Sequence, residues 1–405
     1  MGLANHHQGI NAGDVYETNR GAVLRAIHTF GPLTQNEIVE NTGLKQPTVS
    51  EATRELLEAN IIKKEKNKNR NSPGRPPKLF ELTSELFGIA VRVARHEIVT
   101  AFVDLDGEVY EKKHYPTSKV RSNEDLLDSV EEALGHYVNS DFVKNNLTVG
   151  VGIAVPGPVN VKSGKITLVT DRLSWSGVNF HKLQSLNHLP VIIRQDADAA
   201  VIGESLFGLA KNNSNVIFIA AGRGIGAGIM VEDRLLLGSK GFSGEFGHTS
   251  VEIEGKACSC GNKGCVERYA SINALLKHLE KRAEKGEITY PREDITFQSV
   301  LELNKSGNQV VKEGVIRSAH YLGAGIANLV NLYGPGLIIL GDEMVQLGSV
   351  WVNEVKQVLK KRNCYWEDLQ VVESHSWENI FLEGAGALAL EKFISKPTAL
   401  LGNLY

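Results

Sequence analysis

A glycine-rich segment at residues 244–267, GEFGHTSVEIEGKACSCGNKGCVE, concentrates side chains that bind transition metals. They are one histidine and three of the four cysteines in the chain: His248, Cys258, Cys260 and Cys265. One imidazole and three thiolates complete a tetrahedral zinc site with no position left for water, so we expect a structural Zn²⁺. The alternative is a redox-active or disulfide-forming pair, but the fourth thiol, Cys364, stands far away in the sequence.

Two carboxylates flank this cluster. Glu245 precedes His248, and Glu267 follows Cys265. Closing the cluster around a metal would fix both carboxylates as hydrogen-bond acceptors facing one spot. The segment therefore predicts a binding site for a ligand rich in hydroxyl groups.

The length and composition bound the fold class. A chain of 405 residues exceeds what one hydrophobic core supports, so we expect two or three domains. Hydrophobic residues make up 42% of the chain and charged residues 22%, as in soluble globular proteins. No apolar run reaches the roughly 18 residues of a membrane span, and the N-terminus lacks the features of a signal peptide. We expect a cytoplasmic protein with no membrane insertion.

The first sixty residues predict a DNA-binding helix-turn-helix. A helix near residues 20–30 ends at Gly31-Pro32, Thr34 caps a second helix with Glu37 in a capping box, and Gly43 makes the next turn. The third helix should bury Val49, Ala52, Leu56 and Leu57. We expect it to present polar side chains to the major groove: Gln46, Thr48, Ser50, Glu51, Thr53 and Arg54.

A basic wing should follow these helices. Residues 61–78 hold seven Lys or Arg against Glu65 alone, and Ile61-Ile62 can pair as a strand with Lys78–Phe80. Between them, Arg70 and Arg75 are the candidates for insertion into an adjacent minor groove of double-stranded DNA. The alternative is an ordinary helical subdomain with a solvated Lys-rich loop. The combination of three helices, Gly turn and basic wing favours DNA binding.

From Phe87 onward, strand patterns alternate with helical ones, which indicates an α/β body. The segment from Asp104 to Val109 predicts a hairpin, so the first sheet should be mixed. Two α/β halves of similar size, with the ligand between them, fit the remaining length.

Five segments in this body, AVPGPV, RQDADAA, GRGIGAGI, GFSGEFGH and CSCGNKGCVE followed by RYAS, resemble the signature segments of the ROK family. That family comprises repressors and sugar kinases built on the two-lobed actin-like ATPase fold, and a leading winged helix is typical of its repressor branch. Within the family the chain is most similar to xylose repressors. The resemblance implies a winged helix at residues 1–80, a first lobe at 81–195 and a second lobe at 196–405 that carries the zinc loop and the C-terminal helix.

The resemblance also implies sugar contacts. Asp196 matches the catalytic base of the kinases, which contacts a sugar hydroxyl, and Gln195 stands where an asparagine is usual. Glu245, Glu267 and His248 match further polar contacts, with one nitrogen of His248 on zinc and the other toward the sugar. Pro156 and Gly157 match the loop that walls the pocket. Taken singly, Asp196 could be a helix cap and Glu267 a surface carboxylate.

The kinases of the family carry D-x-G-G-T in their first strand, where this chain has Ala90 to Ala94 without a glycine. A second glycine loop, Gly222 to Ile229, is retained. We therefore expect no ATP-dependent phosphorylation, and predict a repressor released from an inverted-repeat operator by a sugar, free or phosphorylated. Arg92 or Arg223 could receive a phosphate. A homodimer or homotetramer is expected, and the alternatives are a sugar kinase with an accessory DNA head or a repressor controlled by a protein partner.

Overall fold

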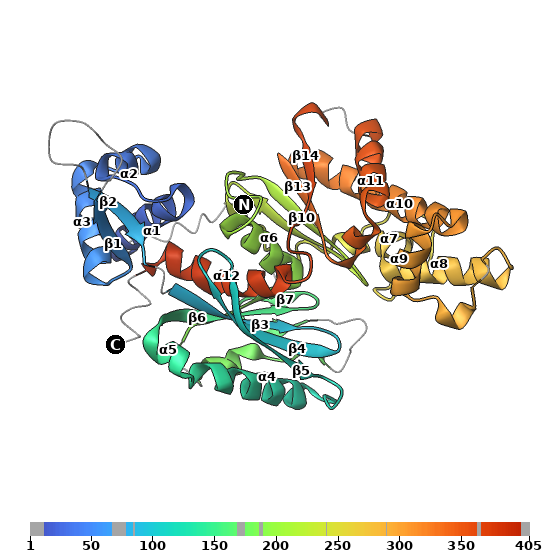
Figure 1. Cartoon of the computed structure of the whole chain (residues 1–405), viewed down its shortest axis with the longest axis horizontal. Helices are drawn as coiled ribbons and strands as arrows, with labels where there is room; N and C mark the ends of the chain where they lie inside the picture. Colours follow the sequence, from blue (N-terminus) through green and yellow to red (C-terminus); the bar gives the residue numbers. More distant parts are fainter. Residues whose placement is uncertain are drawn as a thin grey trace, which may run out of the picture.

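The computed structural model describes residues 12–66, 78–83, 86–167, 175–185, 189–239, 241–288, 290–362 and 366–397. In Figure 1 the N-terminal head lies at one end of the molecule, beside a body with two sheets. Arg70, Arg75 and Cys364 lie outside the described residues. None of the described helices combines the length and apolar character needed to cross a bilayer.

The head contains the predicted three helices and wing strands, α1 (Ala12–Phe30), α2 (Gln35–Thr42), α3 (Gln46–Glu58), β1 (Ile62–Lys66) and β2 (Lys78–Leu82). Thr34 and Glu37 form the predicted capping box of α2, and Gly43 ends that helix with a φ of 69°. The two strands pair antiparallel with Ile62 opposite Leu82. The winged helix-turn-helix prediction is confirmed.

The first sheet of the body has the strand order β5-β4-β3-β6-β9. Its strands are β3 (Leu86–Val93), β4 (Glu97–Asp104), β5 (Val109–Pro116), β6 (Leu147–Val155) and β9 (Val191–Gln195). The hairpin predicted after Asp104 joins β4 to β5, and β6 runs parallel to β3, so the sheet is mixed as expected. Alternate residues of β3 face opposite ways: Phe87, Ile89 and Val91 share a core with α4 (Asn123–Val138).

The second sheet has the order β12-β11-β10-β13-β14. Its strands are β10 (Val216–Ala221), β11 (Ile225–Val231), β12 (Arg234–Leu235), β13 (Leu337–Gly341) and β14 (Gln370–Glu373). One face packs on α6 (Asp196–Leu206) through Val216 and Phe218. The other face, through Ile217 and Ile219, packs on a helical layer that includes α8 (Ile272–Glu284), α10 (Gln309–Tyr333) and α11 (Ser349–Arg362).

Helix α12 (Ile380–Ser395) contacts the head, the first sheet and the helix α6 that covers the second sheet. Figure 1 shows it lying between β3 and β6 on one side and α6 on the other. Small residues allow this close packing. A Cβ on Gly384 would lie 2.4 Å from the carbonyl oxygen of Ala199 in α6, and a Cβ on Gly152 in β6 would lie 1.7 Å from that of Ala385. Glycine is therefore required at both contacts.

The far end of α12 holds the head. Leu390, Phe393 and Ile394 belong to one hydrophobic core with Leu24 and Ile27 of α1. Ion pairs from Arg25 to Glu391 and from Lys396 to Asp14 flank this core. The head is thus docked on the body through a continuous apolar interface, and both contribute to its stability.

Candidate functional site

A cavity of about 560 Å³ lies where the two sheets meet, and its walls come from both. All six residues expected to contact a sugar line it: Gly157, Gln195, Asp196, Glu245, His248 and Glu267. The structure brings these residues together from distant parts of the sequence, while their role toward a sugar stays a prediction. Gly157 has a φ of 85°, a left-handed conformation that favours glycine, in the loop that follows β6.

Gln195 and Asp196 stand at the junction of β9 and α6, where a strand ends and a helix begins. Gln195 is almost fully buried, and its Nε2 donates to Glu245 Oε1 at 3.1 Å. Its Oε1 is buried and finds no hydrogen-bond partner within the described part of the chain. A buried acceptor normally has a partner, so this oxygen is positioned for a donor from a ligand.

Asp196 is a half-buried carboxylate at the start of α6. Its Oδ1 accepts a hydrogen bond from the backbone N–H of Ala197 at 2.8 Å. Burial raises the pKa of Asp196 to about 7, with the charges of Asp342 and Glu245 raising it further and the guanidinium of Arg92 opposing the increase. At neutral pH the carboxyl group therefore exists in both protonation states.

Asp342 is a cavity residue that the sequence reasoning missed. It follows β13 with a φ of 70°, and its Oδ1 accepts from the N–H of Glu343 at 2.9 Å. A Cβ on Gly222 would lie 2.1 Å from Asp342 Oδ2, so the glycine hairpin is what admits this carboxylate. Burial raises the pKa of Asp342 to about 6. The available signal was a polar residue directly after an apolar strand, where ligand sites of α/β sheets concentrate.

Glu267 connects the metal-binding segment to the glycine hairpin. Its Oε2 accepts from the backbone N–H of Ile225 at 3.0 Å, and a Cβ on Gly224 would stand 3.0 Å from the same oxygen. The retained glycine loop is therefore a tight hairpin between β10 and β11 that Glu267 fixes in place. Glu267 begins α7 (Glu267–Ala270) and lines the cavity, so it is not merely a surface carboxylate.

The four predicted metal ligands converge on one point. The ligand atoms of His248, Cys258, Cys260 and Cys265 all lie within 4.8 Å of one another. The Sγ atoms of Cys260 and Cys265 are 3.7 Å apart, which excludes a disulfide between them and is close to the roughly 3.8 Å separation in a tetrahedral zinc–thiolate site. The cluster can bind a metal ion.

His248 belongs to both the cluster and the cavity. Its Nδ1 lies 3.6 Å from Cys258 Sγ, while its Nε2 lies 3.9 Å from Glu245 Oε2. Gly264 allows the segment to close, because a Cβ there would lie 1.6 Å from the carbonyl oxygen of Glu252. One ring nitrogen thus faces the thiols of the cluster and the other the cavity, while the contact of His248 with a sugar stays a prediction from the resemblance.

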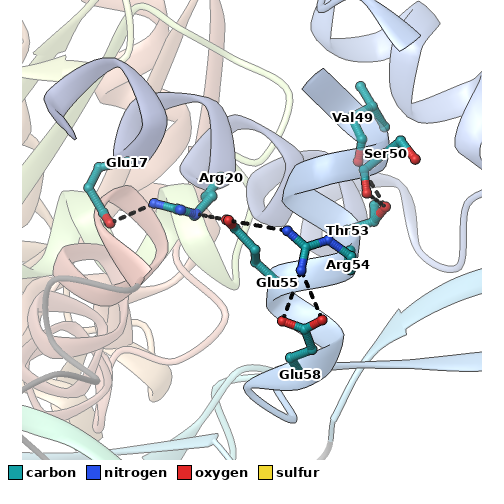
Figure 2. Close-up of polar contacts among 8 residues, drawn as sticks. All are labelled: Glu17, Arg20, Val49, Ser50, Thr53, Arg54, Glu55 and Glu58. Atoms are coloured by element: carbon teal, nitrogen blue, oxygen red, sulfur yellow. Dashed lines mark hydrogen bonds and ion pairs between the residues drawn. The ribbon is translucent and has the colours of Figure 1, made fainter. Parts of the chain in front are cut away.

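Helix α3 presents a polar surface to solvent, with Gln46, Ser50, Glu51 and Arg54 exposed and Thr48 half-buried. The expectation that Thr53 points outward is wrong. Its side chain is only 2% exposed, and its hydroxyl donates to the carbonyl oxygen of Val49 at 2.8 Å and lies 3.1 Å from that of Ser50, as Figure 2 shows. Helical periodicity places position 53 beside the core positions 49, 52 and 56, and the backbone bond satisfies the buried hydroxyl.

A chain of charged residues links α3 to α1. Arg20 of α1 pairs with Glu55 and with Glu17, and Arg54 pairs with Glu58 at 3.0 Å and lies 3.8 Å from Glu55 (Figure 2). The ion pairs of Arg54 are therefore formed with residues of its own helix, α3. The Arg20–Glu55 pair joins residues far apart in sequence, and no local pattern pointed to it.

The comparisons with known proteins agree with this architecture. The ROK family model matches residues 88–392, and the MarR family model matches residues 18–70. The xylose repressor of Caldicellulosiruptor bescii is 29% identical over 393 residues, which cover 94% of this chain and 97% of the repressor.

Two solved structures are similar. A ROK family transcriptional regulator, a homologue of the Escherichia coli MLC protein, superposes with a TM-score of 0.83 at 25% identity and covers 96% of this chain and 99% of its own. A ROK family glucokinase from Streptomyces griseus, in complex with glucose and AMPPNP, gives a TM-score of 0.66 at 26% identity and covers 75% of this chain and 99% of its own. With a MarR-type winged helix before a kinase-like body, the chain belongs to the ROK family.

Proposed function

We propose that this protein is a DNA-binding transcriptional repressor that a sugar releases from its operator. One observation carries the proposal: a winged helix shares a hydrophobic core with a two-lobed body whose cavity gathers Gln195, Asp196, Glu245 and His248. The names of the relatives, a xylose repressor and a ROK transcriptional regulator, support the same function.

The cavity suits a hydroxyl-rich ligand, such as a free or phosphorylated sugar. Asp196, Glu245 and Glu267 offer carboxylate oxygens that accept hydrogen bonds from hydroxyl groups, and Gln195 Oε1 offers a further unpartnered acceptor. Gly157 has no side chain, so its backbone forms part of the cavity wall and can lie close to the ligand. The related glucokinase was solved with glucose, which supports a sugar in this place.

The metal in the cluster is, on this proposal, a structural Zn²⁺ held by His248, Cys258, Cys260 and Cys265. Three thiolates and an imidazole fill its coordination, so the ion supplies rigidity and not a reactive water. Its effect on the cavity passes through His248, whose ring orientation it would fix.

The protein is proposed not to be a kinase. The strand that carries the first phosphate loop in family kinases is here β3, with Ala90, Val91 and Val93 buried. The N–H of Ala94, at the end of that strand, already donates to the carbonyl oxygen of Glu97 at 2.8 Å. A coupled ATP-consumption assay across common hexoses and pentoses should show no turnover. Turnover at an enzyme-like rate would favour the alternative, a sugar kinase with an accessory DNA head.

DNA recognition is assigned to α3 and the wing. The exposed side chains of Gln46, Ser50 and Glu51, with Thr48 beside them, would read the major groove. Arg70 and Arg75 are proposed for the minor groove on the sequence alone. Two heads would read an inverted repeat, so we propose a homodimer or homotetramer.

The body is proposed to divide at Asp196, into lobes of residues 81–195 and 196–405. Helix α6, which begins at Asp196, packs on the second sheet, while α12 returns to cover the first. Both helices begin at the cavity, where Asp196 and Phe381 line it. The other end of α12 holds α1 of the head. Sugar binding that changes the lobe angle would therefore move the head.

Operator binding, followed by fluorescence anisotropy at fixed salt, tests the proposal. We expect tight binding to a fragment with an inverted repeat and release by at least one monosaccharide of a panel of free and phosphorylated sugars. Occupancy that no sugar alters would contradict the proposal. If a purified component of the sugar-transport system, and no sugar, releases the protein from DNA, the alternative of control by a protein partner is favoured.

A further inference from the structure

Arg92 is a cation inside the cavity whose role the proposed function leaves open. In β3, the residues Gly88 and Ala90 face α12, and Arg92 is the next residue on this face. Arg92 lies beside the first turn of α12. Its guanidinium is placed over the ring of Phe381, with Cζ 4.8 Å from the ring centroid. Arg92 is the one half-buried position in an otherwise buried strand.

The position of the Arg92 guanidinium depends on Phe381, which is itself held by a second aromatic contact. Its ring also packs edge-on against Phe218 of the second sheet, with 6.4 Å between the ring centroids. The guanidinium therefore rests on an aromatic side chain that is held from the opposite lobe. A cation stacked on a ring has a defined position while its N–H groups remain available at its edge.

Those N–H groups have no acceptor among the residues that the structure describes. Among the described residues, no carboxylate oxygen lies within ion-pairing distance of Arg92, and no acceptor forms a hydrogen bond with it. Two half-buried carboxylates, Asp196 and Asp342, line the same cavity. Each has one oxygen bound to a backbone N–H and a second oxygen without such a bond.

We propose that Arg92 is a positioning residue of this cavity: its guanidinium, held on Phe381, supplies the charge that lets Asp196 and Asp342 act as hydrogen-bond acceptors for the bound sugar. This inference rests on the proposed function and adds to it the residue that sets its pH dependence. It assigns a role to the side chain that stands in the strand where the kinases of the family carry a phosphate loop.

The electrostatics of the cavity support the proposal. Arg92 lowers the pKa of both Asp196 and Asp342, against burial, which raises both. The other groups around Asp196 are Asp342 and Glu245, which raise its pKa, and the N–H of Ala197, which lowers it. The charge of Glu343 raises the pKa of Asp342, whereas the backbone N–H of Glu343 and the charge of Arg223 lower the pKa of Asp342. Without Arg92, neutral pH would leave both carboxyl groups more protonated.

The test measures sugar affinity by calorimetry from pH 5.5 to pH 9 in wild type, Arg92→Lys and Arg92→Met, using the monosaccharide that releases the wild type from DNA. Wild-type affinity should rise with pH as Asp196 ionises. In Arg92→Met the midpoint of this rise should move up by about one pH unit, which weakens binding about fivefold at pH 7 and hardly at all at pH 9. Arg92→Lys should restore most of the wild-type profile, and Arg223→Met should shift it by less than Arg92→Met does.

Three results would overturn the proposal. They are an unchanged midpoint in Arg92→Met, an equal shift in Arg223→Met, and selective loss of a phosphorylated sugar, which would make Arg92 a phosphate ligand. Intact folding of each variant is checked by metal content and by operator binding.

A measurement without sugar separates this inference from the proposed function. Thermal unfolding is followed for wild type, Arg92→Met, Asp196→Asn and the double variant. At pH 8, Arg92→Met should lower Tm more when Asp196 is present than when Asp196→Asn has removed its charge, and at pH 5 the two decrements should agree. Equal decrements at both pH values would contradict the role of Arg92 even if a sugar binds, and unequal decrements at pH 8 alone would support it even if none does.

Discussion

The DNA-binding head and the cavity of the body hold their functional side chains in opposite environments. On α3 most polar side chains, among them Gln46, Ser50 and Arg54, are exposed, and the ion pair of Arg54 with Glu58 lies at the surface. In the cavity, Asp196 and Asp342 are half-buried, and their removal from water raises the pKa of each. Binding at the head should therefore respond to salt, whereas binding in the cavity should respond to pH and to the proposed metal in its wall.

The largest expected effect comes from the metal cluster. If the cluster holds the proposed Zn²⁺, Cys258→Ser and Cys265→Ser should lose the ion and at least 100-fold in sugar affinity, because structural zinc contributes about 10 kcal/mol or more to folding in small zinc domains. Operator binding at low temperature should fall much less, since α12 and not the cluster holds the head. Elemental analysis, calorimetry and anisotropy measure the three quantities. Metal-free protein with normal sugar affinity would refute the structural role.

Asp196→Asn should produce the next largest effect. Two hydrogen bonds from sugar hydroxyls to a carboxylate are together worth about 3 kcal/mol, or a loss of about 100-fold in affinity. Operator affinity without sugar should stay within twofold of wild type, which serves as the internal control. A variant that binds sugar normally would show that the carboxylate is only a helix cap.

At Asp198 the effect of burial on the pKa of a carboxyl group can be measured without a bound sugar. The side chain of Asp198 is buried, its Oδ1 has no hydrogen-bond partner within the described residues, and burial raises its pKa to about 8, opposed by Arg194. Because the folded pKa lies above the unfolded one, the protonated carboxyl stabilises the fold at low pH, and this contribution is lost as pH rises toward 8.

The substitution Asp198→Asn removes this dependence. Relative to wild type, its free energy of unfolding should rise by about 2 kcal/mol between pH 6 and pH 8, as measured by urea denaturation. A difference that stays constant with pH would show that Asp198 is ionised throughout.

In the head, Gln46→Ala and Ser50→Ala should weaken operator binding by about 1 kcal/mol or more each, as expected for base contacts. Thr53→Ala is the matched comparison from the same helix. Because its hydroxyl is buried and bonded to the backbone, its loss should lower stability by about 1 kcal/mol and leave operator affinity nearly unchanged. Loss of operator specificity in Thr53→Ala would reverse this assignment.

The smallest effect concerns the ion pairs of Arg54. Glu58→Gln should free Arg54 and raise operator affinity by at most about twofold, since exposed ion pairs contribute less than about 1 kcal/mol. Arg54→Ala should reduce the slope of log affinity against log salt by about one, if Arg54 contacts a phosphate. An unchanged slope would place Arg54 outside the interface.

Much of the fold follows from local sequence patterns. The capping box of Thr34 and Glu37, the turn at Gly43 and the hairpin after Asp104 each depend on residues close together in the chain. The cluster of His248 with three cysteines has the same origin. Such features could be predicted because their energetics are local.

What could not be predicted depends on contacts between distant segments. Asp342 reaches the cavity only because Gly222, far away in sequence, leaves room for its carboxylate. The burial of Thr53, by contrast, follows from the helical periodicity of α3, and the expectation failed because its polar side chain was assigned to the outer face. Gln195 and Asp196 were expected near Glu245 through the family resemblance alone, since no local pattern joins them.

The most direct test of the central claim is the reciprocity of the two sites. Sugar affinity is measured by calorimetry for the free protein and for the operator complex, and operator affinity with and without saturating sugar. If the sites are coupled through α12, both ratios must be equal and about tenfold or larger, with sugar binding more weakly to the complex. Equal sugar affinities for the free and the DNA-bound protein would contradict the account.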